Sequence, residues 1–205
     1  GKTLGIIGYG NIGSQVSVLA EALGMKIRFY DIETKLPLGN AVACKSLKEV
    51  VSQSDIVSLH VPETNQTKNM VNKALLKQFK QGAILINYAR GEVVDIPALT
   101  KALEEKQLSG AAIDVFPVEP EKNGDVFESP LQGLHNVLLT PHIGGSTEEA
   151  QENIGEDVSI KLFQYLERGI TNGSHTVPPI SLPPVDGAHR ILHIHNNVPG
   201  VLSAI

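Results

Sequence analysis

The sequence is short of basic charge, of cysteine and of long apolar runs. Its 17 Lys and Arg are outnumbered by 22 Asp and Glu, giving a formal net charge of −5, whereas nucleic acids and anionic membranes are bound mainly through excess basic charge. The single cysteine, Cys44, excludes an internal disulfide and fits a reducing cytoplasm, where it would be a small apolar filler. No apolar run approaches the roughly 18 residues of a membrane span. We therefore expect a cytoplasmic protein that binds neither nucleic acid nor membrane.

The composition is that of an ordinary globular protein. Of the 205 residues, 41% are hydrophobic and 19% charged, enough for one large domain or for one domain with pieces of others. The chain begins without Met or a signal peptide and enters an apolar run at once. Its other end opens what looks like a further strand and helix. We therefore expect a fragment of a longer protein.

Six short apolar runs define the expected fold. They are too continuous to have one wet face, so they predict strands covered on both sides. The runs span residues 4–8, 26–30, 56–61, 83–87, 110–115 and 136–140. Helical patterns lie between them: Ile12, Val16, Leu19 and Leu23 predict an apolar helix stripe. This alternation predicts an α/β fold, a Rossmann-type doubly wound parallel sheet, over residues 1–145.

Capping signals and a change of pattern predict the remaining helices and the domain order. Ser46 and Ser146 begin predicted capping boxes, and Asp95 with a proline in the first turn begins another helix. The helix from Ser146 is long and amphipathic, and we assign 146–172 to it. A stiff, proline-rich linker is expected at 173–188, and 189–205 begins a further domain.

A glycine motif predicts a dinucleotide site. Gly8-Tyr-Gly10-Asn-Ile-Gly13 directly follows a strand and opens a helix. In that context one glycine makes the tight turn, the second admits a pyrophosphate and the third lets the helix pack on the strand, with the helix N-terminus facing the phosphates. Asp31, after the next strand, would accept the ribose hydroxyls of NAD and repel the extra phosphate of NADP. The alternative is a glycine-rich loop beside a solvated carboxylate.

Three later strand ends carry Arg90, Glu119 and His142. Ligands bind at the carboxyl ends of parallel strands, and the long irregular segment that holds Glu119 is of a kind that is usually functional. An arginine fork suits a substrate carboxylate, although a lone arginine is more often a surface ion-pair partner. Histidine titrates near neutral pH and can take a hydroxyl proton, with Glu119 orienting its ring. Beside a nicotinamide, this set predicts oxidation of a 2-hydroxyacid by hydride transfer, and no metal is required.

The segments GYGNIG, INYARG, DVFPVEP and TPHIGGST resemble those of the D-isomer-specific 2-hydroxyacid dehydrogenases, from residue 1 to about 170. The resemblance implies Arg90, Glu119 and His142 as catalytic residues. It also implies NAD contacts from the glycine turn, from three strand ends and from the segment after the last strand. These are Gly8, Gly10, Asn11, Ile12, Gly13, Asp31, His60, Ala89, Arg90, Asp114, His142, Gly144 and Gly145.

Three further stretches narrow the resemblance: YDIETKLPLGNA, GGSTEEAQENIG and HIHNNVPGVLSAI. They resemble family members that oxidise 3-phospho-D-glycerate to 3-phosphohydroxypyruvate, the first step of phosphorylated serine biosynthesis, some with a side reduction of 2-oxoglutarate. In those members the long helix returns to a substrate domain. The tail resembles the start of an ACT (ferredoxin-like) regulatory domain, which implies serine as effector at His195 and Asn197, and a homotetramer. The alternatives are a glyoxylate, hydroxypyruvate or lactate enzyme of the family, or an NAD-sensing corepressor-like binding protein.

Overall fold

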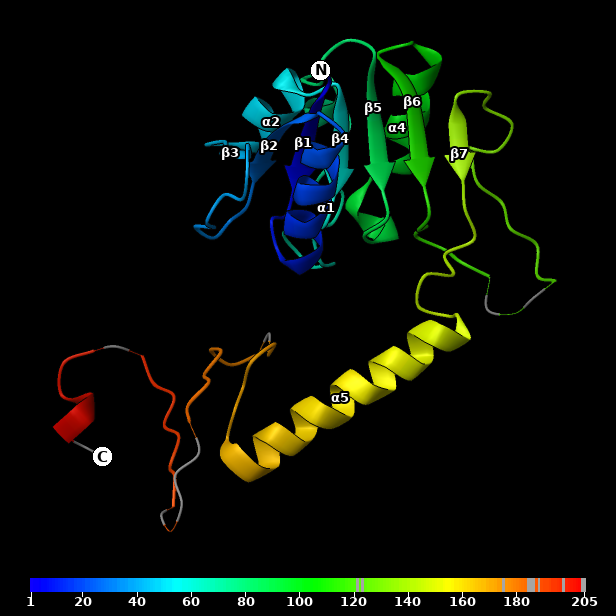
Figure 1. Cartoon of the computed structure of the whole chain (residues 1–205). Coiled ribbons are helices and arrows are strands. Elements are labelled where there is room, and N and C mark those ends of the chain that lie inside the picture. Colours follow the sequence, from blue (N-terminus) through cyan, green and yellow to red (C-terminus); the bar gives the residue numbers. More distant parts are fainter. Residues whose placement is uncertain are drawn as a thin grey trace. The chain divides into compact units, whose positions relative to one another are not determined.

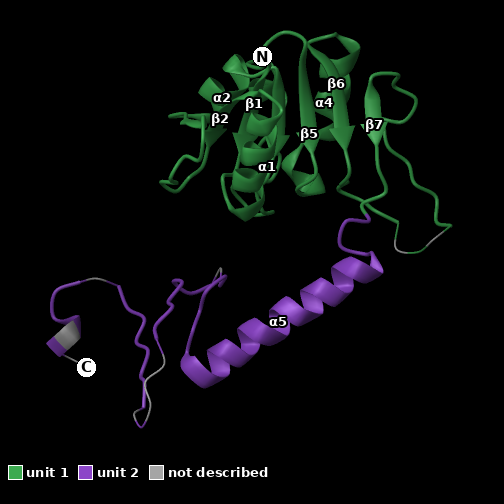
Figure 2. Cartoon of the chain, in the orientation of Figure 1, with its two compact units in different colours: residues 1–142 green, residues 143–205 purple. Residues whose placement is uncertain are grey.

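The computed structural model describes the chain except residues 121, 123, 175, 184–186, 188, 197, 204 and 205. It divides into a first unit, residues 1–142, and a second unit, residues 143–205 (Figure 2). None of the helices in the part of the chain so described combines the length and apolarity that crossing a membrane requires.

The first unit is built on one parallel sheet of seven strands (Figure 1). The strands are β1 Thr3–Ile7, β2 Lys26–Tyr30, β3 Val42–Ala43, β4 Ile56–Leu59, β5 Ala83–Asn87, β6 Leu108–Ile113 and β7 Val137–Leu139. Their order is β3-β2-β1-β4-β5-β6-β7, so the chain runs outward from β1 in one direction, returns at β4 and runs outward in the other. The predicted doubly wound parallel sheet is confirmed. Between β1 and β4 the strand order reverses, which is where such sheets open a ligand crevice.

Helices cover both faces of the sheet. They are α1 Asn11–Ala22, α2 Leu47–Gln53, α3 Lys73–Leu76 and α4 Ile96–Glu104, with a 3-10 turn η1 at Gly91–Val93. Figure 1 shows α1 in front of the sheet and α4 behind it. Neither β3 nor α3 is predicted by the sequence patterns, because elements of two and four residues are too short to show a period.

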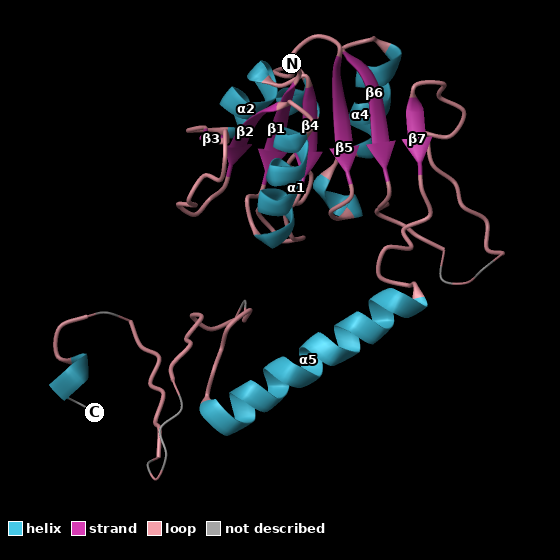
Figure 3. Ribbon diagram, viewed as in Figure 1, coloured by secondary structure: helices cyan, strands magenta, loops and turns pink. Residues whose placement is uncertain are grey.

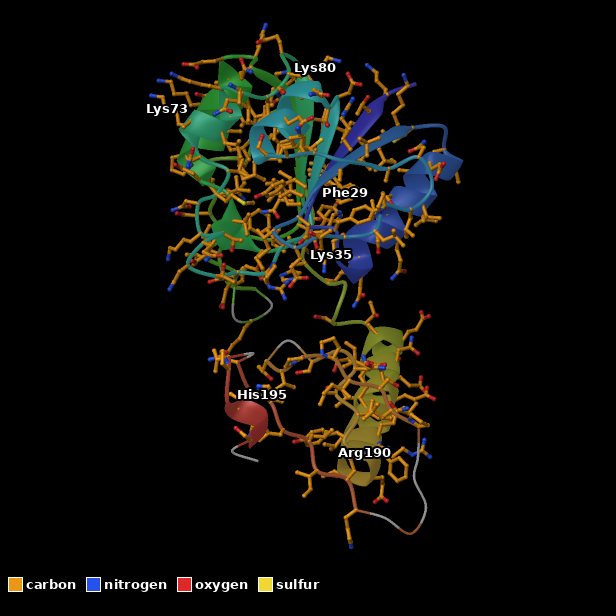
Figure 4. All side chains as sticks on the ribbon, turned by 90° about the vertical axis from the view of Figure 1, so that its left-hand side faces the viewer. Phe29, Lys35, Lys73, Lys80, Arg190 and His195 are labelled. Atoms are coloured by element: carbon orange, nitrogen blue, oxygen red, sulfur yellow. The ribbon has the colours of Figure 1, made fainter. Side chains whose placement is uncertain are left out.

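Each face of the sheet has its own apolar core. The smaller core packs α1 against β1 and β2 through residues such as Ile6 and Phe29, the second of which is labelled in Figure 4. The Phe29 ring stacks on Tyr9 at 3.8 Å between centroids. The larger core includes Ile7, from the other face of β1, with residues of α2, α3 and α4. Adjacent residues of β1 thus pack into opposite cores, which explains why every side chain of the strand's core segment is apolar.

Of the predicted packing stripe of α1, only Val16 packs against the smaller core, and the other three residues do not. Ile12, Leu19 and Leu23 are 66%, 67% and 82% exposed, while Gly13, Ser17 and Ala20 are buried against the sheet. The helix lies so close to the strand that a Cβ on Gly13 would be 2.1 Å from the Gly8 carbonyl oxygen. Small side chains form the closest part of this contact, and Ile12, Leu19 and Leu23 lie on the exposed side of the helix.

Two predicted caps are confirmed and one is wrong. The Ser46 side chain accepts the Glu49 N–H, and the Asp95 side chain accepts the Ala98 N–H. The long helix α5, Glu148–Arg168, is capped by Thr147 rather than Ser146, because the Thr147 hydroxyl accepts the Ala150 N–H. Both residues carry a hydroxyl that can cap a helix, but only Ser146 has a Glu three residues later, so the capping-box signature favours the wrong one and the helix begins one residue later than predicted.

The second unit consists of α5 and a largely irregular tail (Figure 3). No residue of α5 is buried, and apolar side chains including Ile154, Val158 and Leu166 are exposed. Within the described residues after 188 there is a 3-10 turn, η2 Val201–Ser203, and no strand. The strand expected in this tail is therefore absent there, because its described residues have no neighbouring strand with which to form a ladder.

Candidate active site

The glycine turn between β1 and α1 has the shape of a phosphate cradle. Gly8 has a φ of +92°, and a Cβ there would be 2.4 Å from the carbonyl oxygen of His60, the residue after β4. Gly13 allows the close helix contact described above. A Cβ on Gly10, in contrast, would meet no atom within 4 Å, so the backbone there borders open space that a dinucleotide can fill. Asn11 and Ile12 form the exposed first turn of α1 beside that space.

Asp31 joins the end of β2 to the glycine turn. Its Oδ2 accepts the Tyr9 N–H at 2.7 Å, and its Oδ1 accepts the Glu33 N–H at 2.9 Å. A carboxylate has about four acceptor positions, so both oxygens can still accept ribose hydroxyls. These residues fit a dinucleotide whose pyrophosphate lies on the turn and whose ribose lies at Asp31.

His60 follows β4 on the other side of the strand-order reversal. Its Nε2 lies 3.0 Å from the Ser58 hydroxyl. Burial lowers the pKa of His60 below its ordinary value of 6.5, so the imidazole is neutral at neutral pH. The residue therefore adds no charge beside the strand-order reversal.

Glu119 and His142 form a hydrogen-bonded pair. The His142 Nδ1 lies 2.8 Å from Oε2 and 3.0 Å from Oε1 of Glu119, and Oε1 also accepts the Phe116 N–H at 2.9 Å. Because the carboxylate can only accept, Nδ1 carries the hydrogen. The outer nitrogen, Nε2, is then the one that can take up or release a proton.

Asp114, after β6, fixes the backbone that carries the histidine. Its Oδ1 accepts the His142 N–H at 3.1 Å and the Thr140 hydroxyl. His142 has a φ of +50°, a conformation uncommon for residues other than glycine. Thr140 is not predicted as part of this site, although a hydroxyl at the end of an apolar run and two residues before a candidate histidine is a usable signal.

Arg90 lies at the exposed turn after β5. Its Nη1 donates to the Ala89 carbonyl at 2.6 Å, and among the described residues no hydrogen bond or ion pair joins it to Glu119 or His142. The two segments are nevertheless in backbone contact, because a Cβ on Gly91 would be 2.0 Å from the Phe116 carbonyl carbon. The structure thus pairs Glu119 with His142 and packs the Arg90 turn against the start of the Glu119 loop.

The remaining predicted site residues belong to the second unit. Gly144 and Gly145 follow His142 after one intervening residue, and no atom lies within 4 Å of a Cβ built on either. The His195 Nδ1 lies 2.9 Å from the Asn196 carbonyl oxygen, and its ring centroid is 5.3 Å from that of His193. Asn197 is outside the described residues.

Comparisons with known proteins give the family of this chain. The family model for the D-isomer specific 2-hydroxyacid dehydrogenase, NAD binding domain, matches residues 1–144. D-3-phosphoglycerate dehydrogenase of Haemophilus influenzae is 60% identical over the whole chain, and that of Escherichia coli strain K12 is 58% identical. The chain spans half the length of these curated relatives (50% of each).

One solved structure with the same fold contains bound NAD. It is the NAD-complexed D-isomer specific 2-hydroxyacid dehydrogenase of Lactobacillus delbrueckii ssp. bulgaricus, with a TM-score of 0.72 and 32% identity over 82% of this chain and 54% of that one. This chain belongs to the D-isomer-specific 2-hydroxyacid dehydrogenase family, and its first 144 residues are the family's NAD-binding domain.

Proposed function

We propose that the complete gene product oxidises 3-phospho-D-glycerate to 3-phosphohydroxypyruvate with NAD, as the first step of phosphorylated serine biosynthesis. The observation that carries the chemistry is the Glu119–His142 pair, which leaves one imidazole nitrogen for a substrate proton. Support for the substrate comes from the relatives that this chain matches over its whole length, which are named D-3-phosphoglycerate dehydrogenases.

Each catalytic residue has a distinct role in this proposal. The Arg90 fork binds the substrate carboxylate, for which its planar pair of N–H groups is suited. As the hydride leaves the carbon that bears the hydroxyl, His142 Nε2 takes the hydroxyl proton, so that the carbon becomes a carbonyl. Glu119 holds the ring through Nδ1 and stabilises the imidazolium that forms. The cofactor, when bound, supplies the nicotinamide carbon that accepts the hydride.

The cofactor contacts proposed are those of the glycine turn and the strand ends. Gly8, Gly10, Gly13 and the first turn of α1 hold the pyrophosphate, and Asp31 selects NAD by repelling a ribose phosphate. His60 is assigned to the adenosine side. The nicotinamide end is assigned to the residues around the catalytic pair, which are Ala89, Arg90, Asp114, His142, Gly144 and Gly145.

Regulation and assembly are proposed from the second unit. The apolar side chains exposed along α5 support the assignment of 146–172 to a helix that packs on a substrate domain. We assign 173–188 to a linker and 189–205 to the start of an ACT domain. That domain would bind serine at His195 and Asn197 as a feedback inhibitor. We also propose that the complete gene product is a homotetramer in the cytoplasm.

A second candidate is another activity of the family, such as reduction of glyoxylate, hydroxypyruvate or pyruvate. It is favoured by a solved D-lactate dehydrogenase of Sporolactobacillus sp. with a TM-score of 0.72 and 36% identity. A third, an NAD-sensing binding protein, would bind the cofactor without turnover.

The test measures NADH oxidation by the complete gene product with phosphohydroxypyruvate, hydroxypyruvate, glyoxylate, pyruvate and 2-oxoglutarate, each with and without serine. The proposal expects the highest kcat/KM with phosphohydroxypyruvate, and inhibition by serine. A higher kcat/KM with an unphosphorylated 2-oxoacid other than 2-oxoglutarate would overturn the substrate assignment. NADH binding without turnover on any of them would favour the binding protein.

A further inference from the structure

We propose that Asn87 is a positioning residue for Arg90. The inference rests on the proposed function, since it concerns how Arg90 is presented to the substrate. Asn87 is the last residue of β5 and is fully buried, with 0% of its surface exposed. It is the only asparagine that the described residues of the chain bury in this way.

Both ends of the Asn87 amide are used within the turn that carries Arg90. The Oδ1 accepts the Ala89 N–H at 3.1 Å, and the Nδ2 donates to the Arg90 carbonyl at 2.9 Å. The Ala89 carbonyl in turn accepts the Arg90 Nη1 at 2.6 Å. One buried side chain thus holds the backbone on both sides of Arg90, and the guanidinium rests on a carbonyl of that same turn.

The backbone of Asn87 ties this turn to the histidine side of the site. Its carbonyl accepts the Asp114 N–H at 3.1 Å, and the Asp114 carboxylate accepts the His142 N–H. A change in the Asn87 side chain leaves these backbone hydrogen bonds available. Substitution should therefore move Arg90 while the Glu119–His142 pair stays in place.

Only an amide satisfies the turn as it is built. A carboxylate of the same shape would accept the Ala89 N–H but would face the Arg90 carbonyl with an acceptor instead of a donor. A serine hydroxyl could still reach the Ala89 N–H, two residues on, but it is too short to bridge to the Arg90 carbonyl as well. Asn87→Asp and Asn87→Ser both remove the donor, one with added charge and one without.

Loss of the donor should weaken catalysis more than cofactor binding. A displacement of about 1 Å at a substrate-positioning group can cost about 100-fold in rate. We expect kcat/KM for phosphohydroxypyruvate to fall about 10- to 100-fold, while the Kd for NADH changes by less than about threefold. The NADH Kd is read from quenching or enhancement of NADH fluorescence.

Asn40 supplies a control near the start of β2, whereas Asn87 lies at the end of β5. The Asn40 Oδ1 accepts the Ile27 N–H at 3.2 Å and its Nδ2 donates to the Met25 carbonyl at 2.9 Å, so Asn40→Asp removes the same kind of donor near the start of β2. That variant should lower Tm and leave kcat/KM within about twofold of wild type.

A double-mutant cycle separates positioning from a general structural role. The complete gene product is assayed as wild type, Asn87→Asp, Arg90→Lys and the double variant, with Asn87→Ser in parallel in case Asn87→Asp does not fold. Arg90→Lys keeps the charge but has no fork to be aligned. The loss caused by Asn87→Asp should therefore shrink to about twofold or less in the Arg90→Lys background.

Two results would overturn the inference: wild-type kcat/KM in a folded Asn87 variant, or an equal loss of kcat/KM in both Arg90 backgrounds. Absence of turnover in the wild-type protein is a different outcome, because it contradicts the proposed function itself.

Discussion

A methyl group at Gly91 should separate Arg90 from the Glu119 loop. In the structure, a Cβ on Gly91 would lie 2.0 Å from the carbonyl carbon of Phe116, 2.2 Å from its oxygen and 2.5 Å from the Pro117 nitrogen. All three are backbone atoms, so no side-chain rotation relieves the overlap. Restoring an ordinary contact of about 3.5 Å requires the two segments to move apart by about 1 to 1.5 Å.

That displacement sets the size of the expected effects. Forcing extra volume into a packed contact costs about 1–3 kcal/mol, so the free energy of unfolding of Gly91→Ala should fall by about that amount. A displacement of 1 Å or more between the groups that hold the substrate and the group that takes its proton should lower kcat/KM by about 100-fold. The assay is NADH-dependent reduction of phosphohydroxypyruvate by the complete gene product, with urea unfolding in parallel.

Gly5→Ala is the matched control for this prediction. A Cβ on Gly5 would be 2.4 Å from the Ser54 Oγ and 2.7 Å from the Val50 Cγ1, so it also overpacks the sheet, but against side chains of the α2 region. It should lower stability and leave kcat/KM within about threefold. A Gly91→Ala variant with wild-type kcat/KM, or an equal loss in Gly5→Ala, would refute the reasoning.

Three further predictions concern cofactor binding and pH. Gly10→Ala should leave Tm unchanged, because no atom lies within 4 Å of the new Cβ, and should weaken NADH binding at least about tenfold by filling the phosphate cradle; unchanged fluorescence titration would contradict it. Burial lowers the pKa of His60 below 6.5, so the unfolded state binds more protons below that pH, and the free energy of unfolding should fall as the pH drops from about 6.5. This fall should be smaller in His60→Gln. The Lys80 ammonium, 2.6 Å away, and the Thr3 N–H lower the pKa of Asp55 below 3.8. Its contribution is therefore present above pH 3.8 and lost as the pH falls through the folded-state pKa, and urea unfolding should show Asp55→Asn less stable at pH 7 with a weaker dependence on pH below 4.

Lys80 lies on the surface of the first unit (Figure 4), so the Asp55 effect should also weaken with added salt. Unfolding midpoints at low and high NaCl would measure this. An equal midpoint for wild type and Asp55→Asn at pH 7 would contradict the role given to the ion pair.

The strands and the glycine turn were predictable because their signals are local. Continuous apolar runs specify buried parallel strands, and Gly8 and Gly13 occupy positions where any Cβ would meet a backbone oxygen. The packing face of α1 was not predictable from periodicity. Periodicity shows where apolar residues lie. The close approach of the helix to the strand instead places residues with small side chains, Ser17 and Ala20, against the sheet.

The candidate site was predictable only in part. Strand ends indicate which residues share an edge, and the Glu119–His142 contact agrees with that expectation. The hydrogen bonds that fix the backbone of the site, from Asn87 and Asp114, depend on turn geometry that no spacing in the sequence encodes. The tail of the second unit shows the same limit, since an apolar run becomes a strand only when another strand is there to pair with it.

The most direct test of the account is hydride transfer in His142→Ala. The complete gene product should lose about 10²- to 10⁴-fold in kcat for phosphohydroxypyruvate reduction while its NADH Kd stays within about threefold of wild type. Turnover close to wild type in this variant would show that the imidazole beside Glu119 does not carry the substrate proton.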